Sequence, residues 1–161
     1  MLLKEVLRIL EVDAKQTPAQ IAAMTGVTED EVTGLIRQAE EDGAIIKYRA
    51  LVDWDKVGSE YVWALIEVKV TPQRTVGFDA IAERIYRFDE ARTVYLMSGA
   101  YELAVLVSAR SMHEVADFVT QKLAAIEGVT GTASHFLLKR YKEDGVIISG
   151  GAGTSRQAVV L

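Results

Sequence analysis

Two motifs that begin helices lie eleven residues apart near the start of the chain, and they constrain its fold more than any other feature. Thr17 is followed three residues later by Gln20, and Thr28 is followed in the same way by Glu31. In such a capping box the Thr hydroxyl accepts a hydrogen bond from the later backbone N–H, and the Gln or Glu side chain accepts one from the Thr N–H. Because Gly26 permits a tight turn just before the second motif, the pattern predicts two helices joined by a short turn.

Apolar residues at helical spacing extend this pattern on both sides. They predict a first helix over residues 2–11, a second that ends near Met24, and a third over residues 28–42. Gly43 is placed to end the third helix, and the alternating residues 44–52 favour a small hairpin. Three helices followed by a hairpin form a winged helix-turn-helix, which binds DNA in many proteins and docks onto other proteins in some.

After residue 60 the pattern changes to strands alternating with helices. β-branched and aromatic residues at alternate positions predict strands, and apolar residues three and four positions apart predict helices. A further capping box at Ser111 and Glu114 opens the last helix. The expected strands cover residues 61–70, 93–97, 101–109 and 129–141, and the expected helices cover residues 78–88 and 111–127. The order β-α-β-β-α-β is that of a ferredoxin-like sandwich, so the chain is expected to be of the α+β class.

A ferredoxin-like sheet carries both helices on one face and leaves the other face uncovered. Apolar side chains such as Trp63, Leu65 and Leu106 or their neighbours are expected on that open face. Pairing with a second copy of the chain is the simplest way to bury such a surface, so we expect a homodimer.

The chain is expected to contain two domains and a tail. Residues 1–58 form the winged helix-turn-helix domain and residues 59–145 the ferredoxin-like domain. Residues 146–161 include a Gly- and Ser-rich stretch followed by four apolar residues, which predicts a flexible tail or a clasp on a neighbouring subunit.

Composition excludes several classes of protein. The chain has no cysteine, so it holds neither disulfides nor thiolate metal sites, and no apolar run approaches the roughly 18 residues of a membrane span. His113 and His135 do not have the spacing of paired metal ligands, and no phosphate-binding glycine loop with its Lys is present. We therefore expect a cytoplasmic protein without metal, cofactor or enzymatic activity.

The turn at residues 98–102 is the best candidate for binding a small molecule. Backbone N–H groups beside Gly99 can face a carboxylate, while Glu102 offers negative charge to an ammonium group. Thr132 and Ser134 are two residues apart, hence on one face of their strand, and can add hydroxyl hydrogen bonds. The combination fits an amino acid, although a turn of this kind also occurs as a plain hairpin connection.

Taken together, these segments resemble the Lrp/AsnC family of prokaryotic transcription regulators. The resemblance covers roughly residues 2–145 and depends on the order of several motifs. They are Ile21-Ala22, Gly26-Val27-Thr28, Glu40-Glu41-Asp42-Gly43-Ala44-Ile45, Tyr48-Arg49-Ala50-Leu51-Val52-Asp53, Val57-Gly58, Ser98-Gly99-Ala100-Tyr101-Glu102 and Glu127-Gly128-Val129 with Thr132 and Ser134. The family implies an N-terminal DNA-binding domain and a C-terminal effector-binding domain, called RAM, that dimerises through its sheet and often assembles into tetramers or octamers.

The resemblance also implies a function for individual residues. Amino acids are the usual effectors of the family. By motif matching, the effector-binding residues are Gly99, Ala100, Tyr101, Glu102, Thr132 and Ser134. Ala100 stands where the family commonly has Asp, and Glu102 lengthens its second acid, so the identity of the ligand is open.

Charge is the weak point of the expected DNA-binding domain. The chain has a net charge of −5, and residues 1–58 hold seven Lys and Arg against eleven Asp and Glu, which leaves −1 for the remainder. The third helix begins with Glu29, Asp30 and Glu31, which stabilise its N-terminus but repel phosphate. The residues expected to contact double-stranded DNA are Thr28, Thr33, Arg37 and Gln38 of the helix and Lys47 and Arg49 of the wing.

Two alternatives follow from these observations. The acidic helix is compatible with an effector-sensing or partner-docking module that does not bind DNA. Sirohaem decarboxylases resemble the same two-domain scaffold, and their substrate would require a cluster of basic and His residues, for which His113 and His135 are the available candidates.

Overall fold

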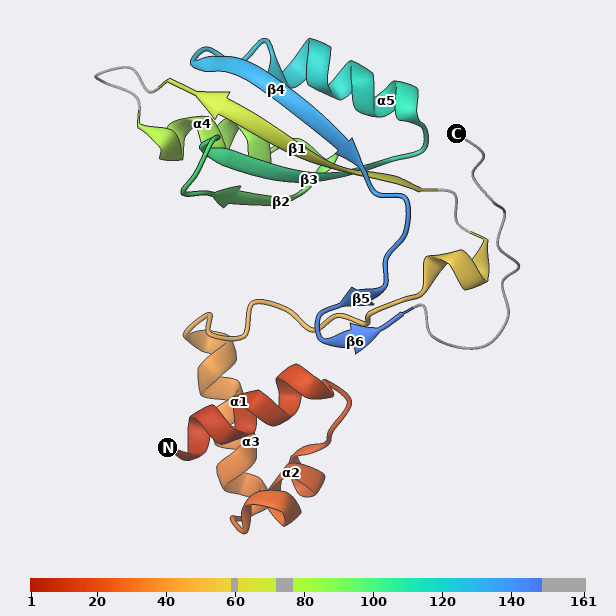
Figure 1. Ribbon diagram of the computed structural model, residues 1–161. Coiled ribbons are helices and arrows are strands. Elements are labelled where there is room, and N and C mark those ends of the chain that lie inside the picture. Colours follow the sequence, from red (N-terminus) through yellow and green to blue (C-terminus); the bar gives the residue numbers. More distant parts are fainter. Residues whose placement is uncertain (59–60, 72–76, 149–161) are drawn as a thin grey trace. The chain divides into compact units, whose positions relative to one another are not determined.

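A computed structural model of the protein describes residues 1–58, 61–71 and 77–148 (Figure 1). The chain divides into two compact units, Met1–Val52 and Asp53–Leu161, called below the helical unit and the sheet unit. The domain limits inferred from the sequence, with boundaries after residues 58 and 145, stay a prediction.

The helical unit consists of α1 (Leu2–Val12), α2 (Pro18–Thr25) and α3 (Glu29–Glu41). Both predicted capping boxes are present, since the Thr17 and Thr28 hydroxyls accept hydrogen bonds of 3.3 Å from the N–H groups three residues on. Gly26 ends α2 with φ at 74°, a left-handed conformation that favours glycine. The predicted helix-turn-helix is confirmed.

A small apolar core joins the three helices. Its buried members are Val6 and Leu10 of α1, Ile21 and Ala22 of α2, and Val32 of α3. Ile45, just beyond α3, packs against the same cluster. The exposed faces of the helices are therefore free to carry polar side chains.

The predicted hairpin over residues 44–52 is not formed, because none of these residues lies in a strand. The stretch contains no Gly, Pro, Asn or Asp, the residues on which a tight hairpin turn depends. It is held against α3 instead. The Ile45 N–H donates to the Ala39 carbonyl oxygen at 3.0 Å, and the Tyr48 hydroxyl donates to the Glu40 carboxylate at 2.9 Å.

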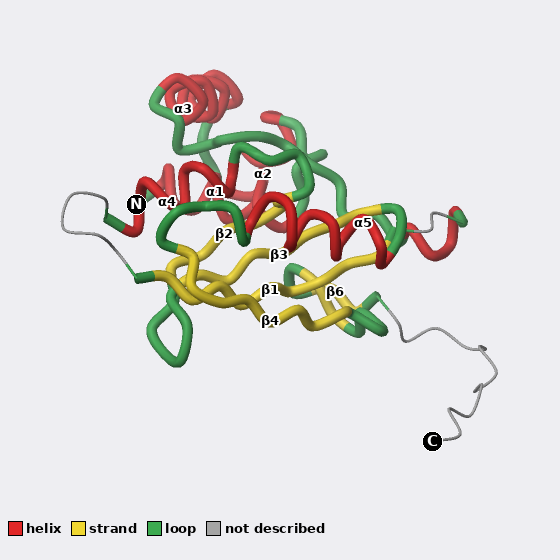
Figure 2. Tube along the Cα trace, turned by 90° about the horizontal axis from the view of Figure 1, so that it is seen from above, coloured by secondary structure: helices red, strands yellow, loops and turns green. Residues whose placement is uncertain are grey.

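The sheet unit begins with a short 3₁₀ helix, Trp54–Val57, and continues as a βαββαβ fold. Its elements are β1 (Val62–Val70), α4 (Phe78–Tyr86), β2 (Ala91–Leu96), β3 (Leu103–Ala109), α5 (Met112–Asp117) and β4 (Val129–Phe136). The strands form one antiparallel sheet in the order β2-β3-β1-β4 (Figure 2). This is the predicted ferredoxin-like topology.

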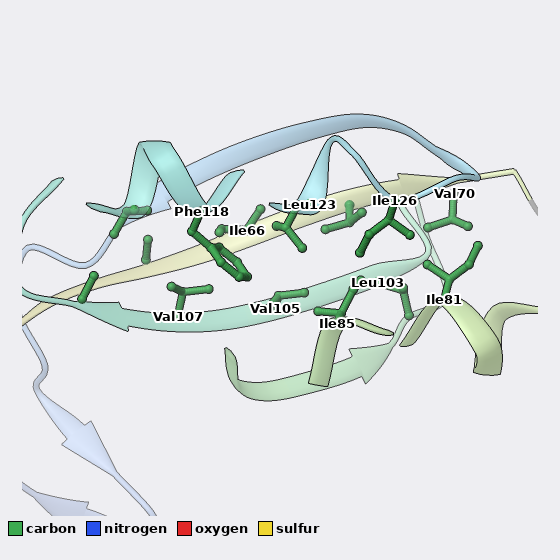
Figure 3. Packing of buried hydrophobic residues seen from close by; sticks show 14 residues of the cluster. Ile66, Val70, Ile81, Ile85, Leu103, Val105, Val107, Phe118, Leu123 and Ile126 are labelled. Atoms are coloured by element: carbon green, nitrogen blue, oxygen red, sulfur yellow. The ribbon is translucent and has the colours of Figure 1, made fainter. Parts of the chain in front are cut away.

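Both helices pack on one face of this sheet. Alternate residues of β1 and β3, among them Ile66 and Val105, are buried under Ile81 and Ile85 of α4 and under Phe118 (Figure 3). Gly128 precedes β4 with φ at 96°, and a Cβ built there would lie 2.8 Å from the Ile81 side chain, so only glycine fits.

The second helical segment differs in detail from the prediction. Ser111 caps α5 by accepting from the Glu114 N–H at 3.2 Å, but the Glu114 carboxylate accepts from the Arg110 N–H, so the capping box is incomplete. The chain then continues as a π-helix over Phe118–Leu123. No pattern of apolar residues distinguishes a π-turn from an α-turn of this length.

The end of the described chain also differs from the prediction. β4 stops at Phe136, and not at residue 141 as predicted. Its partner strand β1 begins at Val62, so the last bond between the two strands is the one from the Leu137 N–H to the Trp63 carbonyl oxygen. A small hairpin follows, with β5 (Lys142–Glu143) and β6 (Val146–Ile147). Its turn, Asp144-Gly145, has positive φ at both residues and is a strong hairpin signal that the sequence analysis missed. The Gly-rich stretch and apolar end expected to form a tail or clasp lie outside the described residues.

Candidate functional site

The exposed face of α3 carries the predicted base-contacting side chains. Val32 and Ala39 are buried, whereas Thr33, Arg37 and Gln38 are exposed. We call these three exposed residues the recognition face. Because they lie within six positions on one helix, their side chains can project together into a groove.

Thr28 is committed to the start of α3. Its hydroxyl accepts from the Glu31 N–H and donates to the Glu31 carboxylate at 2.9 Å, and its own N–H donates to the same carboxylate at 3.0 Å. The hydrogen bonds from the Thr28 N–H and hydroxyl lower the pKa of Glu31. Glu31 therefore stays ionised at neutral pH, and its negative charge stands at the helix end that faces phosphate in many helix-turn-helix complexes.

Arg37 is held by an acidic neighbour on the same helix. Its Nε lies 2.8 Å from the Glu41 carboxylate, and both side chains are largely exposed. Such a surface pair contributes only about 0–1 kcal/mol. The guanidinium can therefore exchange Glu41 for a base edge or a phosphate at little cost.

The segment after α3 presents the two predicted phosphate-binding residues. Tyr48 lies between Lys47 and Arg49, and its hydroxyl is bonded to Glu40. Partial burial, followed by the Glu40 hydrogen bond and charge, raises the pKa of Tyr48, so its hydroxyl keeps its proton and stays a donor. Lys47 and Arg49 are both exposed. A side-chain anchor thus replaces the predicted hairpin in placing these cations beside α3.

The predicted effector turn connects β2 to β3. The Met97 N–H donates to the Glu102 carbonyl at 2.7 Å and closes the loop that contains Gly99, Ala100 and Tyr101. The Glu102 carboxylate accepts from the Val70 N–H, also at 2.7 Å. Glu102 thus ties the turn to the end of β1, and its second oxygen remains able to accept from a ligand.

The two hydroxyl residues lie on the far side of β1. Thr132 pairs with Val68 and Ser134 with Ile66, which confirms that both share one strand face. Leu103, the residue after Glu102, pairs with Val68 from the other side. Two interstrand spacings, about 10 Å, therefore separate the turn from Thr132. Within one chain the structure does not bring the two halves of the predicted effector site together.

The uncovered face of the sheet has the predicted apolar residues. Leu65 pairs with Leu106, and both are only partly buried between fully buried neighbours. Trp63 is also partly buried. The register adds two features that the sequence analysis missed, since Tyr95 pairs with Ala104 and is exposed, and His135 lies 3.3 Å from Glu67. Tyr95, Ala104, His135 and Glu67 lie on the uncovered face because of the strand register, which the sequence does not reveal.

Each of the two histidines pairs with a carboxylate in a different part of the sheet unit. His113 pairs with Asp117 on α5 at 3.4 Å, while His135 pairs with Glu67 on the sheet. Within residues 1–58, 61–71 and 77–148, no group of three or more His, Asp or Glu side chains could hold a metal ion. In the same ranges no helix is long and apolar enough to cross a membrane.

A three-helix unit with a polar recognition face, followed by a ferredoxin-like sandwich with one bare face, defines a two-domain helix-turn-helix protein. Residues 63–147 match the family model described as the Lrp/AsnC ligand binding domain. The chain is 47% identical over 156 residues to an uncharacterized HTH-type transcriptional regulator, YugG of Bacillus subtilis. The matched region covers 96% of this chain and 94% of the relative. The protein therefore belongs to the Lrp/AsnC family, and it is a DNA-binding transcriptional regulator with a ligand-binding domain.

Solved structures share the fold at lower identity. The leucine response regulatory protein LrpA of Mycobacterium tuberculosis is 21% identical with a TM-score of 0.74, over 89% of this chain and 94% of that one. A transcriptional regulator from Neisseria meningitidis, solved as a complex with L-methionine, is 19% identical with a TM-score of 0.72, over 88% and 91% of the two chains. The predicted fold class is thereby confirmed.

Proposed function

We propose that this protein is an amino-acid-responsive regulator that binds double-stranded DNA through the recognition face of α3 and acts as a homodimer or a larger assembly in the cytoplasm. The exposure of Thr33, Arg37 and Gln38 on a capped helix that packs into the core through Val32 carries the proposal. In this proposal Arg37 reads guanine, Gln38 reads adenine, and Lys47 and Arg49 hold phosphates. In the same proposal Thr28, which caps the start of the helix, lies beside the backbone of the DNA.

The acidity of α3 limits how tightly one unit can bind. Glu29, Asp30 and Glu31 are all exposed in its first turn. Each neutralised phosphate contributes through counterion release, so a unit with few cations gains little from the backbone. We propose that affinity comes from two or more helical units linked in one oligomer, each adding a weak contact.

The bare face of the sheet supports the oligomer. Trp63, Leu65 and Leu106 lie on it, and pairing with a second copy would remove them from water. We propose dimerisation through this face, and further association of dimers into a tetramer or octamer.

The effector site is proposed at the turn around Gly99 and Glu102, with hydroxyls from Thr132 and Ser134. Since β1 separates these groups in one chain, the two halves of one site are assigned to neighbouring subunits. The Glu102 carboxylate suits an ammonium group, and the backbone N–H groups of the turn suit a carboxylate. The L-methionine complex of the Neisseria regulator is consistent with an amino acid as ligand.

Two alternative functions can be distinguished from the proposed amino-acid-responsive regulator. A docking module without DNA binding is favoured by the acidic start of α3. A sirohaem-decarboxylase-like enzyme would need basic and His side chains gathered in one place, and His113 and His135 instead have separate carboxylate partners. We propose that the protein is a regulator and not an enzyme of this kind. Absence of sirohaem binding in a titration followed by absorbance would remove the enzyme alternative.

The proposal is tested by Arg37→Ala in gel shifts with the DNA upstream of the protein's own gene. Loss of a base contact is expected to weaken binding by about tenfold or more. Arg87→Ala is the matched control, because Arg87 forms the same kind of exposed pair with Glu83, at 2.6 Å, in the sheet unit. Binding that is unchanged in Arg37→Ala would mean that α3 is not the recognition helix. Wild-type binding that is weak and independent of salt would support the docking module.

A further inference from the structure

The turn of the small hairpin contains an aspartate followed directly by a glycine, Asp144-Gly145. The strands on either side, β5 and β6, have two residues each and form a sheet of their own, separate from the four-stranded sheet (Figure 1). The turn therefore lies outside the sheet face that is proposed above to pair with a second copy. None of the residues proposed for DNA or effector contact belongs to it.

An aspartate that precedes a glycine is especially prone to form an imide ring between its side chain and the main chain. The backbone nitrogen of the glycine attacks the carboxyl carbon of the aspartate, and the ring closes as that carboxyl group loses one oxygen as water. Because glycine has no Cβ, its nitrogen is less hindered than that of any other residue. Asparagine reacts in a similar way, but the chain contains none.

The chain provides an internal comparison, because Asp42-Gly43 is a second Asp-Gly sequence and there is no third. The residues of both sites are exposed, so access to solvent does not distinguish them. The hydrogen bonds do distinguish them. At the first site the Gly43 N–H donates to the Glu40 carbonyl oxygen at 3.2 Å, and the Asp42 N–H donates to the Gln38 carbonyl oxygen at 2.9 Å. The nitrogen that would attack is thus held at the end of α3.

The nitrogen of Gly145 is not held in this way. Within residues 1–58, 61–71 and 77–148, the Gly145 N–H donates to no acceptor. The strands around it pair through two residues each, and Val146 and Ile147 of β6 are 55% and 71% exposed. A two-stranded hairpin that buries so little apolar surface opens readily, which leaves its turn able to change conformation.

The backbone of Asp144 is also unusual. Its φ is 45°, and no other non-glycine residue in the described part of the chain has a positive φ. This left-handed conformation is costly for a residue with a Cβ, although Asp tolerates it better than most. Ring closure requires rotation about the bond between Cα and the carbonyl carbon of Asp144. A turn held by so few contacts permits that rotation.

We propose that Asp144 is a site of spontaneous modification, at which the main chain passes through an imide ring and reopens as isoaspartate. The Gly145 nitrogen bonds to Asp144 Cγ, and the amide proton leaves with the carboxyl hydroxyl as water. Water then attacks either carbonyl carbon of the ring. Attack at Cγ restores aspartate, whereas attack at the main-chain carbon breaks its bond to the Gly145 nitrogen, so that the chain runs through Cγ. No atom is gained or lost overall, and water is the only co-reactant.

The modification changes the hairpin. Isoaspartate lengthens the main chain of the turn by one methylene group and places the free carboxylate on the former main-chain carbon. The geometry of a two-residue turn fixes the register of the strands that it joins, so the pairing of Glu143 with Val146 is lost in the modified chain. This inference does not depend on the proposed function.

The test is storage of the folded, full-length protein at physiological temperature and neutral pH, followed by digestion and separation of the two peptides that contain Asp-Gly. Isoaspartate has the same mass as aspartate, so it is detected by its separate elution and by labelling with a methyltransferase specific for isoaspartyl residues. Conversion at Asp144 is expected to be about fivefold faster than at Asp42, the factor that one protecting hydrogen bond provides. Equal conversion at the two sites, or none at Asp144, would overturn the proposal.

Unfolded protein provides the reference rates. In concentrated guanidinium chloride the two Asp-Gly sequences are expected to convert at similar rates, because no folded structure then holds the nitrogen of Gly43. If Asp42 were slower than Asp144 by the same factor in the unfolded chain, the neighbouring residues and not the fold would cause the difference. That result would overturn the structural comparison on which the proposal depends.

Variants then locate the reaction. Asp144→Glu is expected to abolish the signal of the hairpin peptide, because a glutamate would have to close a larger and less favourable ring. Asp42→Glu is the matched control and should leave conversion at Asp144 unchanged. Hydrogen exchange of the amides of residues 142–147 is expected to be faster in the modified protein than in the unmodified one. Labelling that persists in the hairpin peptide of Asp144→Glu would overturn the site, and unchanged exchange would overturn its effect on the hairpin.

Discussion

The two units are specified by contacts of different range. In the helical unit the side-chain bonds join near neighbours, such as Thr28 to Glu31 three residues on and Tyr48 to Glu40 eight residues back. The sheet unit has local bonds too, such as Arg87 to Glu83, but it adds bonds that span 32 residues, from Glu102 to the Val70 N–H and from Lys122 to Glu90. A unit specified locally is largely set by its sequence motifs, whereas a unit specified at long range depends on how its strands pair.

The cores differ in the same direction. The buried cluster of the helical unit is small, with Val6, Ile21 and Val32 at its centre. The buried cluster of the sheet unit draws on β1, β3, α4 and the segment formed by α5 and the π-helix. It includes Phe118, whose ring meets that of Phe88 edge to face at 5.7 Å. Because stabilisation scales with the apolar surface buried, we expect the sheet unit to unfold at the higher temperature.

The largest expected effect comes from Phe118→Ala, which empties the centre of the larger core. Phe118 is 2% exposed, so its truncation is expected to cost about 3–5 kcal/mol of the free energy of unfolding of the sheet unit. Scanning calorimetry of the full chain should show the upper transition moved down and the lower one in place. Ile21→Ala is the complementary variant and should move only the lower transition. If either variant moved both transitions together, the units would be unfolding as one and the comparison would fail.

A smaller effect is expected where one side chain joins distant strands. In Glu102→Ala the Val70 N–H loses its acceptor in a partly buried position, at a cost of about 1–3 kcal/mol to the sheet unit. Glu102→Gln keeps an acceptor oxygen and should recover most of this loss in denaturant titrations. Glu83→Ala, which removes a carboxylate from an exposed pair, should change stability by less than about 1 kcal/mol. A loss in Glu102→Ala no larger than in Glu83→Ala would mean that the turn does not depend on this bond.

The local bonds of the helical unit are tested by its two helix caps. Thr17→Ala and Thr28→Ala each remove a capping hydroxyl and are expected to destabilise the helical unit by about 1 kcal/mol. Only Thr28 begins the recognition helix, so only Thr28→Ala should weaken DNA binding beyond what the loss of stability explains. Thermal unfolding followed by circular dichroism, together with gel shifts on both variants, provides the comparison. Equal loss of DNA binding in the two would remove Thr28 from the interface.

The difference in range also explains what could be predicted from the sequence. The caps at Thr17 and Thr28 located two helices to within a residue or two, because the bonds that form them lie within one turn. Alternation of apolar residues predicted every strand of the main sheet. The hairpin expected over residues 44–52 was wrong because alternation was present without a turn residue, and the β5–β6 hairpin was missed although its Asp144-Gly145 turn signals it.

The residues of the candidate sites differ in the same way in how far the sequence predicts them. Exposure of Thr33, Arg37 and Gln38 was predictable from helical periodicity. The bond from Glu102 to Val70, and the separation of Thr132 from the turn by β1, depend on strand register and so lie beyond a reading of the sequence.

The smallest effect is expected at Gly34, and it separates stability from recognition within one helix. Gly34 is exposed in α3, and a Cβ built there meets nothing within 4 Å, so Gly34→Ala should stabilise the helical unit by about 0.5–1 kcal/mol. Gly34 lies three and four positions before Arg37 and Gln38, on the same exposed side, so the added methyl group is expected to weaken DNA binding severalfold by holding the helix away from the DNA. Gly43→Ala is the control of opposite sign, because φ there is 70° and alanine would be strained. Stability that rises while DNA affinity falls would show that glycine is retained at position 34 for the approach of DNA, and unchanged affinity would place the contact surface elsewhere on the helical unit.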